Sequence, residues 1–438
     1  MRHSALVVVV LLSTTAAFAQ SLPGAELTAS DATTNPGYLG WSVGSSGSTI
    51  AAGAPYASNG MGGRGVVYIF TKPVEKRWHN TMESARLIAP GFDSVNGLLG
   101  VSVAVSLSED VIAVGTYDTY GVGMGIYVFV KPAQGWSGTI LPTALLYPSA
   151  APRPWIQTGN VGVSVAISAA GDTVVGGAPT YGYTQHFHNQ EFVPASLHRG
   201  AVYIFVQPST GWTGTGLQIL NQAAVLTASD GSAEDAFGGS VAISANTIVV
   251  GASGADSEAS GAGAAYLYAK PKNGDWVDRD KFLSKLTVSN ARQSDQLGMY
   301  VAAANGGGLI AVSSGRGCGQ GFLGAAFVYT RPQGGWPAAS TQSAELTAQT
   351  CGNSGGAAIA AQSGTVVVGG FISSNTVSFT KPVGGWSGTL DPTSRLTATK
   401  PCGFGASVGL GSHFAAVGTE CTTVQGTQGA GAVYIYPE

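Results

Sequence analysis

The stretch FGGSVAIS (237–244), a two-residue turn at Ala245-Asn246 and the following TIVVGAS (247–253) decide the fold. A loop then leads to AAYLYAK (264–270), and the chain returns at KLTV (285–288). Each run is rich in Val, Ile and Tyr and is bounded by Gly, Asn, Ser or Pro, which is typical of β-strands. The stretch therefore predicts four successive antiparallel strands, which we call A, B, C and D in chain order.

This unit recurs along the whole chain, and an aromatic residue at the end of strand C marks each of its seven copies: Phe70, Phe129, Phe205, Tyr268, Tyr329, Phe379 and Tyr436. A tryptophan follows in each of the first six copies: Trp78, Trp136, Trp212, Trp276, Trp336 and Trp386. We interpret these tryptophans as structural plugs in the C–D hairpins, and the alternative is a repeated ligand-stacking surface. Strand-rich repeats of this length indicate a propeller.

The seventh copy has no D strand of its own, because the chain stops at Glu438, two residues after Tyr436. The segment AELTAS (25–30) precedes the first A strand and has no other partner. We therefore predict an all-β, seven-bladed β-propeller of four-stranded antiparallel blades. It spans residues 20–438 as one domain and is closed by the N-terminal strand pairing with the last blade.

Residues 1–19 have the features of a secretory signal peptide. A short basic start is followed by an apolar run from Ala5 to Leu12 and by Ala17-Phe18-Ala19 before Gln20. Cleavage is expected near Ala19, which predicts a protein that is secreted, periplasmic or held at the cell surface.

The composition excludes two classes of partner. Charged residues make up 10% of the chain and the formal net charge is −3, so no basic field is available for nucleic acid or an anionic membrane. Beyond the signal, no apolar stretch approaches the roughly 20 residues of a membrane helix. The expected partner is a protein or glycan at the cell surface or outside the cell.

Two short motifs carry a resemblance to a known family. Phe237-Gly238 and Phe404-Gly405 precede strand A, and Gly53-Ala54-Pro55 and Gly177-Ala178-Pro179 end strand B. This pattern resembles the FG-GAP repeat family, the seven-bladed propeller of integrin α-subunit heads and of many secreted bacterial proteins. The resemblance covers essentially the whole mature chain and implies an adhesion or interaction function. The family's calcium loops carry alternating Asp residues in A–B hairpins, and no A–B hairpin of this chain has them.

The B–C and D–A loops are expected to share one face, and the longest pair, residues 147–160 and 181–199, belongs to the third repeat. Long loops with aromatic residues on a rigid scaffold are usual places for binding. The candidate ligand-binding residues are Trp155, Tyr181, Tyr183, His186, His188 and Glu191. The two histidines with Glu191 could instead hold zinc or copper. In a third interpretation the loop packs on its own aromatic residues.

Loops of the fourth repeat carry five carboxylates on the same face: Asp230, Glu234, Asp235, Asp256 and Glu258. They are a candidate calcium site, since calcium prefers carboxylate and carbonyl oxygens. The alternative is a solvated acidic patch.

All four cysteines fall in the last third of the chain, and export permits them to pair. Their loops favour Cys318 with Cys351 and Cys402 with Cys421, and the alternative is four free thiols.

The sequence contains no G-x-S-x-G, H-E-x-x-H or C-x-x-C motif, and no catalytic residue is assigned. We predict a non-catalytic adhesion or protein/glycan interaction module that acts through the B–C and D–A loop face, with no assigned cofactor. A propeller-fold enzyme or lectin acting on polysaccharide at the same face is the alternative, and a purely structural envelope component is a third possibility.

Overall fold

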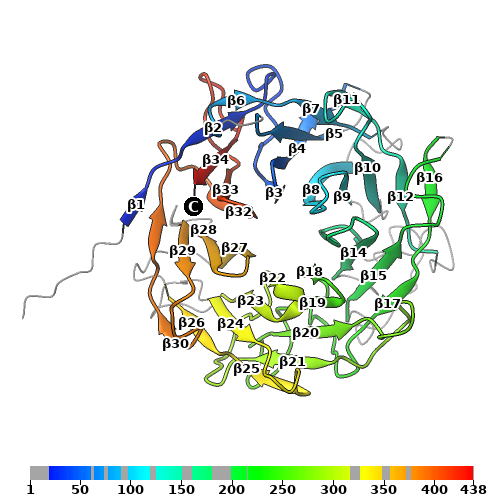
Figure 1. Cartoon of the computed structure of the whole chain (residues 1–438), viewed down its shortest axis with the longest axis vertical. Helices are drawn as coiled ribbons and strands as arrows, with labels where there is room; N and C mark the ends of the chain where they lie inside the picture. Colours follow the sequence, from blue (N-terminus) through cyan, green and yellow to red (C-terminus); the bar gives the residue numbers. More distant parts are fainter. Residues whose placement is uncertain are drawn as a thin grey trace, which may run out of the picture.

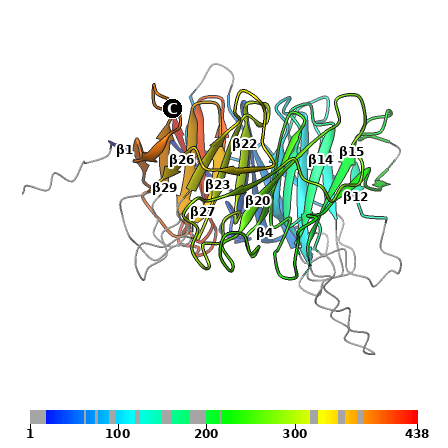
Figure 2. The ribbon, with the colours of Figure 1, turned by 90° about the horizontal axis from the view of Figure 1, so that it is seen from below.

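The computed structural model describes residues 19–60, 64–73, 77–89, 97–118, 125–149, 160–179, 199–214, 216–315, 326–347, 356–370 and 376–437. Across these ranges the regular structure is β-strand, apart from one short 3-10 turn, η2 (Asn305–Gly307). None of their helices is long and apolar enough to cross a membrane. The sheets stand around a central axis, as expected for an all-β propeller (Figure 1), and their strands run between the two faces of a flat disc (Figure 2).

The A strands lie nearest the axis (Figure 1). They are β3 (Ser42–Ser46), β8 (Gly97–Val105), β13 (Ser164–Ile167), β18 (Ser240–Ser244), β22 (Val301–Ala304), β27 (Gly356–Ala361) and β32 (Phe404–Gly411). The B strands pair with them through short turns. They are β4 (Thr49–Ser58), β9 (Val111–Asp118), β14 (Thr173–Ala178), β19 (Thr247–Ala252), β23 (Leu309–Ser313), β28 (Thr365–Gly370) and β33 (Phe414–Thr419).

The C strands follow outward and carry the aromatic residues of the repeat. They are β5 (Arg64–Thr71), β10 (Ile126–Val130), β15 (Ala201–Val206), β20 (Ala264–Ala269), β24 (Ala326–Thr330), β29 (Thr376–Thr380) and β34 (Ala432–Pro437). The D strands pair antiparallel with them. They are β7 (Ala85–Leu87), β12 (Ala144–Leu146), β17 (Ala224–Leu226), β21 (Ser284–Thr287), β26 (Ala344–Leu346), β31 (Ser394–Leu396) and β2 (Ala25–Thr28).

Most sheets contain a fifth, outermost strand that the four-strand prediction missed. These strands are β1 (Ala19–Ser21), β6 (Thr81–Met82), β11 (Gly138–Ile140), β16 (Gln218–Leu220), β25 (Ala339–Thr341) and β30 (Gly388–Leu390). Each pairs parallel with the D strand of the preceding repeat, and all of them except the N-terminal β1 lie in the connection between strands C and D of their own repeat. In the fourth repeat a single bridge between Leu226 and Arg279 takes the same place. Neighbouring sheets are therefore tied together at their outer edges.

The strands form six hydrogen-bonded sheets instead of the seven separate ones predicted. The first and second repeats share one ten-stranded sheet, because Arg64 of β5 pairs in parallel with Leu98 of β8. Similar parallel bridges join Gly200 to Phe237 and Gly263 to Leu297 between other neighbouring repeats. The merged sheet thus reflects one such contact whose two residues both belong to strands.

The N-terminal and C-terminal segments lie in the same sheet. β2 pairs antiparallel with β34, which places Ala25 opposite Ile435 and Leu27 opposite Val433. The amide of Gly24 also donates to the carbonyl of Ile435 at 2.7 Å. The Leu27 side chain is completely buried, so this pairing belongs to the hydrophobic core.

That core lies between neighbouring repeats. One cluster, for example, joins Ile69 and Leu87 of the first repeat to Ile112 and Phe129 of the second. Alternating residues of one strand face opposite sides of a sheet, so each sheet contributes to the core on both of its faces. The repeats therefore stabilise one another, and none buries its apolar side chains alone.

The tryptophans after strand C are plugs, as predicted. Trp136, Trp212 and Trp386 are at most 5% exposed. The Nε1 of Trp136 donates to the carbonyl of Glu109 at 2.9 Å, and that of Trp212 donates to the carbonyl of Gly171 at 2.6 Å. Both acceptors lie in the A–B turn of the same repeat, so the A–B and C–D turns share one face of the disc.

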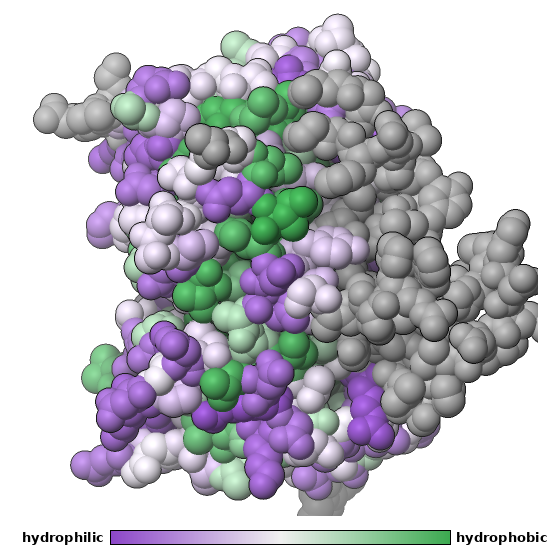
Figure 3. Space-filling view, turned by 90° about the vertical axis from the view of Figure 1, so that its right-hand side faces the viewer, coloured by the Kyte–Doolittle hydropathy of each residue, from purple (hydrophilic) through white to green (hydrophobic). Residues whose placement is uncertain are grey.

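The outer rim exposes apolar side chains between polar ones. Figure 3 views the ring from the side where β12 and β16 lie, and a band of hydrophobic residues runs among hydrophilic ones there. Ile219 of β16 is 66% exposed, and Leu141, just after β11, is 52% exposed. These residues belong to the outer strands, which have a partner on one side alone.

Glu109 ties the A–B turns of the first two repeats together. Its carboxylate accepts hydrogen bonds from the amide and the hydroxyl of Ser48, both at 2.7 Å, and from the hydroxyl of Thr49 at 2.6 Å. Burial raises the pKa of Glu109, but these hydrogen bonds outweigh burial and the net pKa is lowered.

We expect the Glu109→Gln variant to be less stable than the wild type at neutral pH. The lowered pKa means that this contribution is present above the carboxyl's unfolded value and is lost as the pH falls through the folded value. The urea midpoints of the two proteins should therefore converge on acidification below about pH 4. Asp110→Asn is the control, because the exposed pair of Asp110 with Lys131, 3.6 Å apart, contributes little. If the urea midpoints of Glu109→Gln and the wild type still differed as much at acidic pH, the stabilising role of the Glu109 carboxylate would be contradicted.

Candidate functional site

The predicted loop residues of the third repeat, Trp155, Tyr181, Tyr183, His186, His188 and Glu191, lie outside the described residues. Cys318 and Cys351 lie outside them as well. The ligand surface and the first cysteine pair therefore stay predictions.

The second cysteine pair is confirmed, because Cys402 and Cys421 form a disulfide with a sulfur–sulfur distance of 2.07 Å. Cys402 lies just before β32, in a D–A loop, and Cys421 follows β33, in a B–C loop. The bond therefore places these two kinds of loop on the same face, opposite the A–B and C–D turns.

Three of the five carboxylates of the fourth repeat have partners within the protein. Asp230 pairs with Lys285 at 2.7 Å, Asp235 accepts the amide of Ser232 at 2.8 Å, and Asp256 accepts the amide of Gly261 at 2.7 Å. Burial raises the pKa of Asp235, while its bond from Ser232 acts in the opposite direction. Nowhere in the described part of the chain do three His, Cys, Asp or Glu side chains gather as a metal ion would need. The proposed calcium ligands Asp230, Glu234, Asp235, Asp256 and Glu258 thus form no such cluster.

The ion pair of Asp230 has a counterpart in the first repeat, which points to a structural role. Arg86 pairs with Asp31 at 2.9 Å, and the hydroxyl of Tyr68 donates to the same carboxylate at 2.8 Å. In both repeats the acid follows strand D of the previous repeat and the base lies on the repeat's own strand D. The pair therefore fastens a D–A loop to its sheet.

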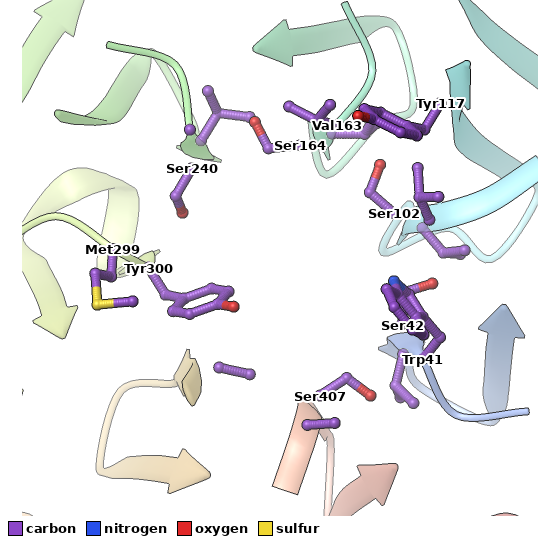
Figure 4. A pocket seen from close by; sticks show the side chains of 18 of the residues that line it. Trp41, Ser42, Ser102, Tyr117, Val163, Ser164, Ser240, Met299, Tyr300 and Ser407 are labelled. Carbon is purple, nitrogen blue, oxygen red and sulfur yellow. The ribbon is translucent and has the colours of Figure 1, made fainter. Parts of the chain in front are cut away.

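A cavity of about 680 Å³ lies on the axis of the ring. Its lining comes from the starts of A strands, such as Trp41 and Ser42, and from the ends of B strands, such as Tyr56 and Tyr117 (Figure 4). Both kinds of position border the face of the D–A and B–C loops. The cavity therefore opens on the face that the sequence predicts for binding.

Six serines line this cavity, and five of them belong to A strands: Ser42, Ser102, Ser164, Ser240 and Ser407. Four of them donate their hydroxyl proton to the glycine carbonyl of the next FG motif or its equivalent. The bonds are Ser42 to Gly100 (2.7 Å), Ser102 to Gly162 (2.6 Å), Ser164 to Gly238 (2.8 Å) and Ser407 to Gly40 (2.7 Å). The hydroxyl oxygen of Ser240 instead accepts the amide of Val301 at 2.9 Å. These serines join neighbouring repeats around the axis.

Other residues at the axis break the repeat pattern. The serine position holds Tyr300 in the fifth repeat and Ala358 in the sixth. The position before the serine holds Trp41 in the first repeat, where the second and third have Val101 and Val163. Tyr300 points toward the centre of the cavity and Trp41 lies across from it (Figure 4). Both replacements put a large aromatic side chain where other repeats have a small one.

Aromatic rings continue from Trp41 onto the rim of the cavity. Tyr56 makes an edge-to-face contact with Trp41, with ring centroids 5.6 Å apart, and another with Tyr38 at 5.4 Å. Trp41, Tyr56 and Tyr38 are 36%, 38% and 39% exposed. Large aromatic side chains left this open beside a cavity are typical of a binding site.

One carboxylate lies near the mouth of the cavity. Glu420 follows β33 at the position that Tyr117 and Ser253 hold in the second and fourth repeats, and both of those line the cavity. Burial raises the pKa of Glu420. Although the Tyr300 ring is partly exposed, desolvation by the surrounding protein raises the pKa of its phenol, and the charge of Glu420 raises it further.

The lining of the cavity offers aromatic faces, hydroxyl oxygens and aliphatic surface. These groups can hold a ligand by stacking and by hydrogen bonding. This site was not predicted, because the shared glycines and hydrophobic residues dominate the repeat pattern and the residue after each FG pair varies. The signal was present there, since Trp41 and Tyr300 depart from valine and serine.

Comparison with known proteins agrees with the motifs. The FG-GAP repeat family matches residues 24–70 and 220–268. No curated protein matches the chain.

Solved structures match with low sequence identity. The computationally designed Ika8 protein is 13% identical, covers 95% of this chain and 100% of its own, and has a TM-score of 0.45. The Dos1 propeller is 12% identical, covers 95% of each chain and has a TM-score of 0.49. The repeat match and the antiparallel sheets around the axis show that the chain contains FG-GAP repeats and has a β-propeller fold.

Proposed function

We propose that the protein is a secreted, non-catalytic interaction module that binds a protein or glycan through the face of its B–C and D–A loops. One observation carries the proposal. The axial cavity opens on this face, and its aromatic residues Trp41 and Tyr300 replace the small residues of other repeats. Repeats that otherwise agree in sequence depart from their pattern mainly where function requires it.

The ring that presents this face is, in our proposal, seven blades closed by the N-terminus. The ten-stranded sheet counts as two blades, because a single parallel contact between Arg64 and Leu98 joins its halves. The pairing of β2 with β34 supports closure. A closed ring leaves no inner sheet edge unpaired and holds the loops of one face in fixed positions.

Export to the cell exterior or periplasm is part of the same proposal. The disulfide between Cys402 and Cys421 supports it, because such bonds persist in oxidising compartments. Removal of residues 1–19 would leave Gln20 and Ser21 free to stay paired with Arg395 and Leu396 in the outer strand.

A binding screen with one substitution tests the proposed face. Labelled protein comprising residues 20–438 is applied to whole cells, matrix proteins and glycan arrays, beside the Trp41→Val variant. Valine occupies the same position in two other repeats, so the variant should fold normally. We expect Trp41→Val to weaken binding about tenfold, the effect of losing one stacked aromatic contact.

Val383→Ser is the matched control, because Val383 is fully exposed in a C–D turn on the opposite face. If Val383→Ser weakened binding as much as Trp41→Val, or if the wild type bound none of the targets, the proposed face would be wrong.

A further inference from the structure

Most of the serines around the cavity can offer a ligand only hydrogen-bond acceptors. Four of them, Ser42, Ser102, Ser164 and Ser407, already donate their proton to a glycine carbonyl at 2.6–2.8 Å. A hydroxyl oxygen has two lone pairs that remain after its proton is used. A ligand group that reaches these serines must therefore be a donor, such as a hydroxyl. Because the serines come from different repeats, the donors must point in several directions.

The aromatic residues supply flat surfaces beside this ring of acceptors. Tyr300 and Trp41 extend from opposite sides toward the space between them (Figure 4). The small side chain of Ala358, in the repeat after Tyr300, also lines the cavity. A ring with an apolar face can stack on either aromatic residue while its edge meets the serines.

The charges around the cavity narrow the choice of ligand. Among the residues that the structure describes, no Asp, Glu, Lys, Arg or His lines the cavity, and the carboxylate of Glu420 lies beside it, near the phenol of Tyr300. An anionic ligand would meet the carboxylate of Glu420, and none of the described lining residues would pair with its charge. The volume of about 680 Å³ is in the range of pockets that enclose a whole small molecule and is too large for one ammonium or guanidinium group to fill.

We infer that the axial cavity binds a neutral carbohydrate, with one sugar ring stacked on Trp41 or Tyr300 and its hydroxyls donating to the serine oxygens. A pyranose ring has the features that the site requires, an apolar face and several hydroxyl donors around its edge. The inference rests on the proposed function and names its ligand class. Glu420 accepts a further hydroxyl at the mouth.

The test uses neutral, acidic and cationic probes on the protein comprising residues 20–438. An array of neutral hexose, pentose and N-acetylhexosamine oligosaccharides is screened, and calorimetry on the best binder follows. Oligogalacturonate and heparin oligosaccharides are the acidic probes, and spermidine and an arginine-rich peptide are the cationic ones. We expect a neutral oligosaccharide to bind and the charged probes to bind at least tenfold more weakly.

Tyr300→Ser is the informative variant, because it restores the residue found in five other repeats and so should fold. It should weaken binding of the neutral oligosaccharide about tenfold, while Val383→Ser leaves it unchanged. Preference for a cationic or acidic probe, or unaltered sugar binding in Tyr300→Ser, would overturn the inference.

The failure of this inference is distinguishable from failure of the proposed function. If cells or matrix proteins bind through Trp41 and no neutral oligosaccharide does, the carbohydrate assignment falls and the interaction face stands. If nothing binds, both fall.

Discussion

Replacing Gly115 by alanine is expected to lower the free energy of unfolding by about 3 kcal/mol or more. The added Cβ would overlap the backbone of the next repeat, which cannot move aside as the end of a flexible side chain would. Gly115 lies near the end of β9, at the first position of the GAP motif. A Cβ atom there would lie closer than 3.0 Å to the carbonyl oxygen of Gly162 in the next repeat, and it would also overlap the hydroxyl of Ser102. The substitution should therefore break the hydrogen bond between Ser102 and Gly162 as well.

Urea unfolding followed by tryptophan fluorescence measures this effect. Gly334→Ala and Gly384→Ala are matched controls, because a Cβ at either position meets no atom within 4 Å and neither glycine has a positive φ. At such sites alanine is tolerated or slightly stabilising. A Gly115→Ala midpoint equal to those of the controls would show that the contact between repeats is not tight.

The same contact explains why the FG and GAP motifs occur together. The glycine of FG adopts a left-handed φ, +104° at Gly162 and +93° at Gly238, and turns its carbonyl toward the preceding repeat. The first glycine of GAP in that repeat, Gly115 or Gly177, leaves room for this carbonyl. The FG glycine of one repeat and the first GAP glycine of the preceding repeat therefore form one contact between neighbours. A repeat that has one of these glycines needs the other in the adjacent repeat.

The strands and the plugs could be predicted because their signals are local. Runs such as TIVVGAS have the composition of a buried strand whatever their neighbours are. The Trp212 plug was predictable from its constant distance to strand C. Predicted strand A of the fourth repeat, 237–244, begins at Ser240 in the structure, because Gly238 takes a positive φ and interrupts the strand.

The outer strands and the fate of the carboxylates could not be predicted in this way. β30 has three residues, and its pairing is decided by a D strand of another repeat, so no local pattern marks it. Asp235 is a residue type that can bind calcium, but one of its carboxylate oxygens accepts the amide of Ser232, three residues earlier. The pairing of β30 and the role of Asp235 both depend on which hydrogen-bond partner the folded structure places beside them.

Deleting residues 19–30 is expected to have the largest effect of all, the loss of a soluble, cooperatively folded protein. The deletion removes β1 and β2 and leaves β31 and β34 each without one of its two strand partners. It also removes Leu27, whose complete burial alone contributes about 2 kcal/mol. Two exposed strand edges in one molecule favour association with other copies. Far-ultraviolet circular dichroism and gel filtration would detect both consequences.

Moving the deleted segment to the other end of the chain should restore the fold. In the sixth repeat, residues 381–387 join β29 to β30, and three residues separate β30 from β31. Three residues likewise separate β1 from β2. The segment 19–28 therefore has the spacing of an outer strand followed by a D strand. It corresponds to these two strands of the seventh repeat, although it lies at the start of the chain.

The permutant begins at Asp31 and continues after Pro437 with a copy of residues 381–387 and then residues 19–30. In the permutant, residues 381–387 join β34 to the moved β1, just as they join β29 to β30 in the sixth repeat. Because β34 ends at Pro437 and β29 ends at Thr380, the connection has the same length in both places. We expect the permutant to be monomeric, with a urea midpoint close to that of the wild type, while the deletion variant aggregates. A deletion variant as stable as the wild type, or a permutant that fails as the deletion does, would mean that β2 does not close the ring.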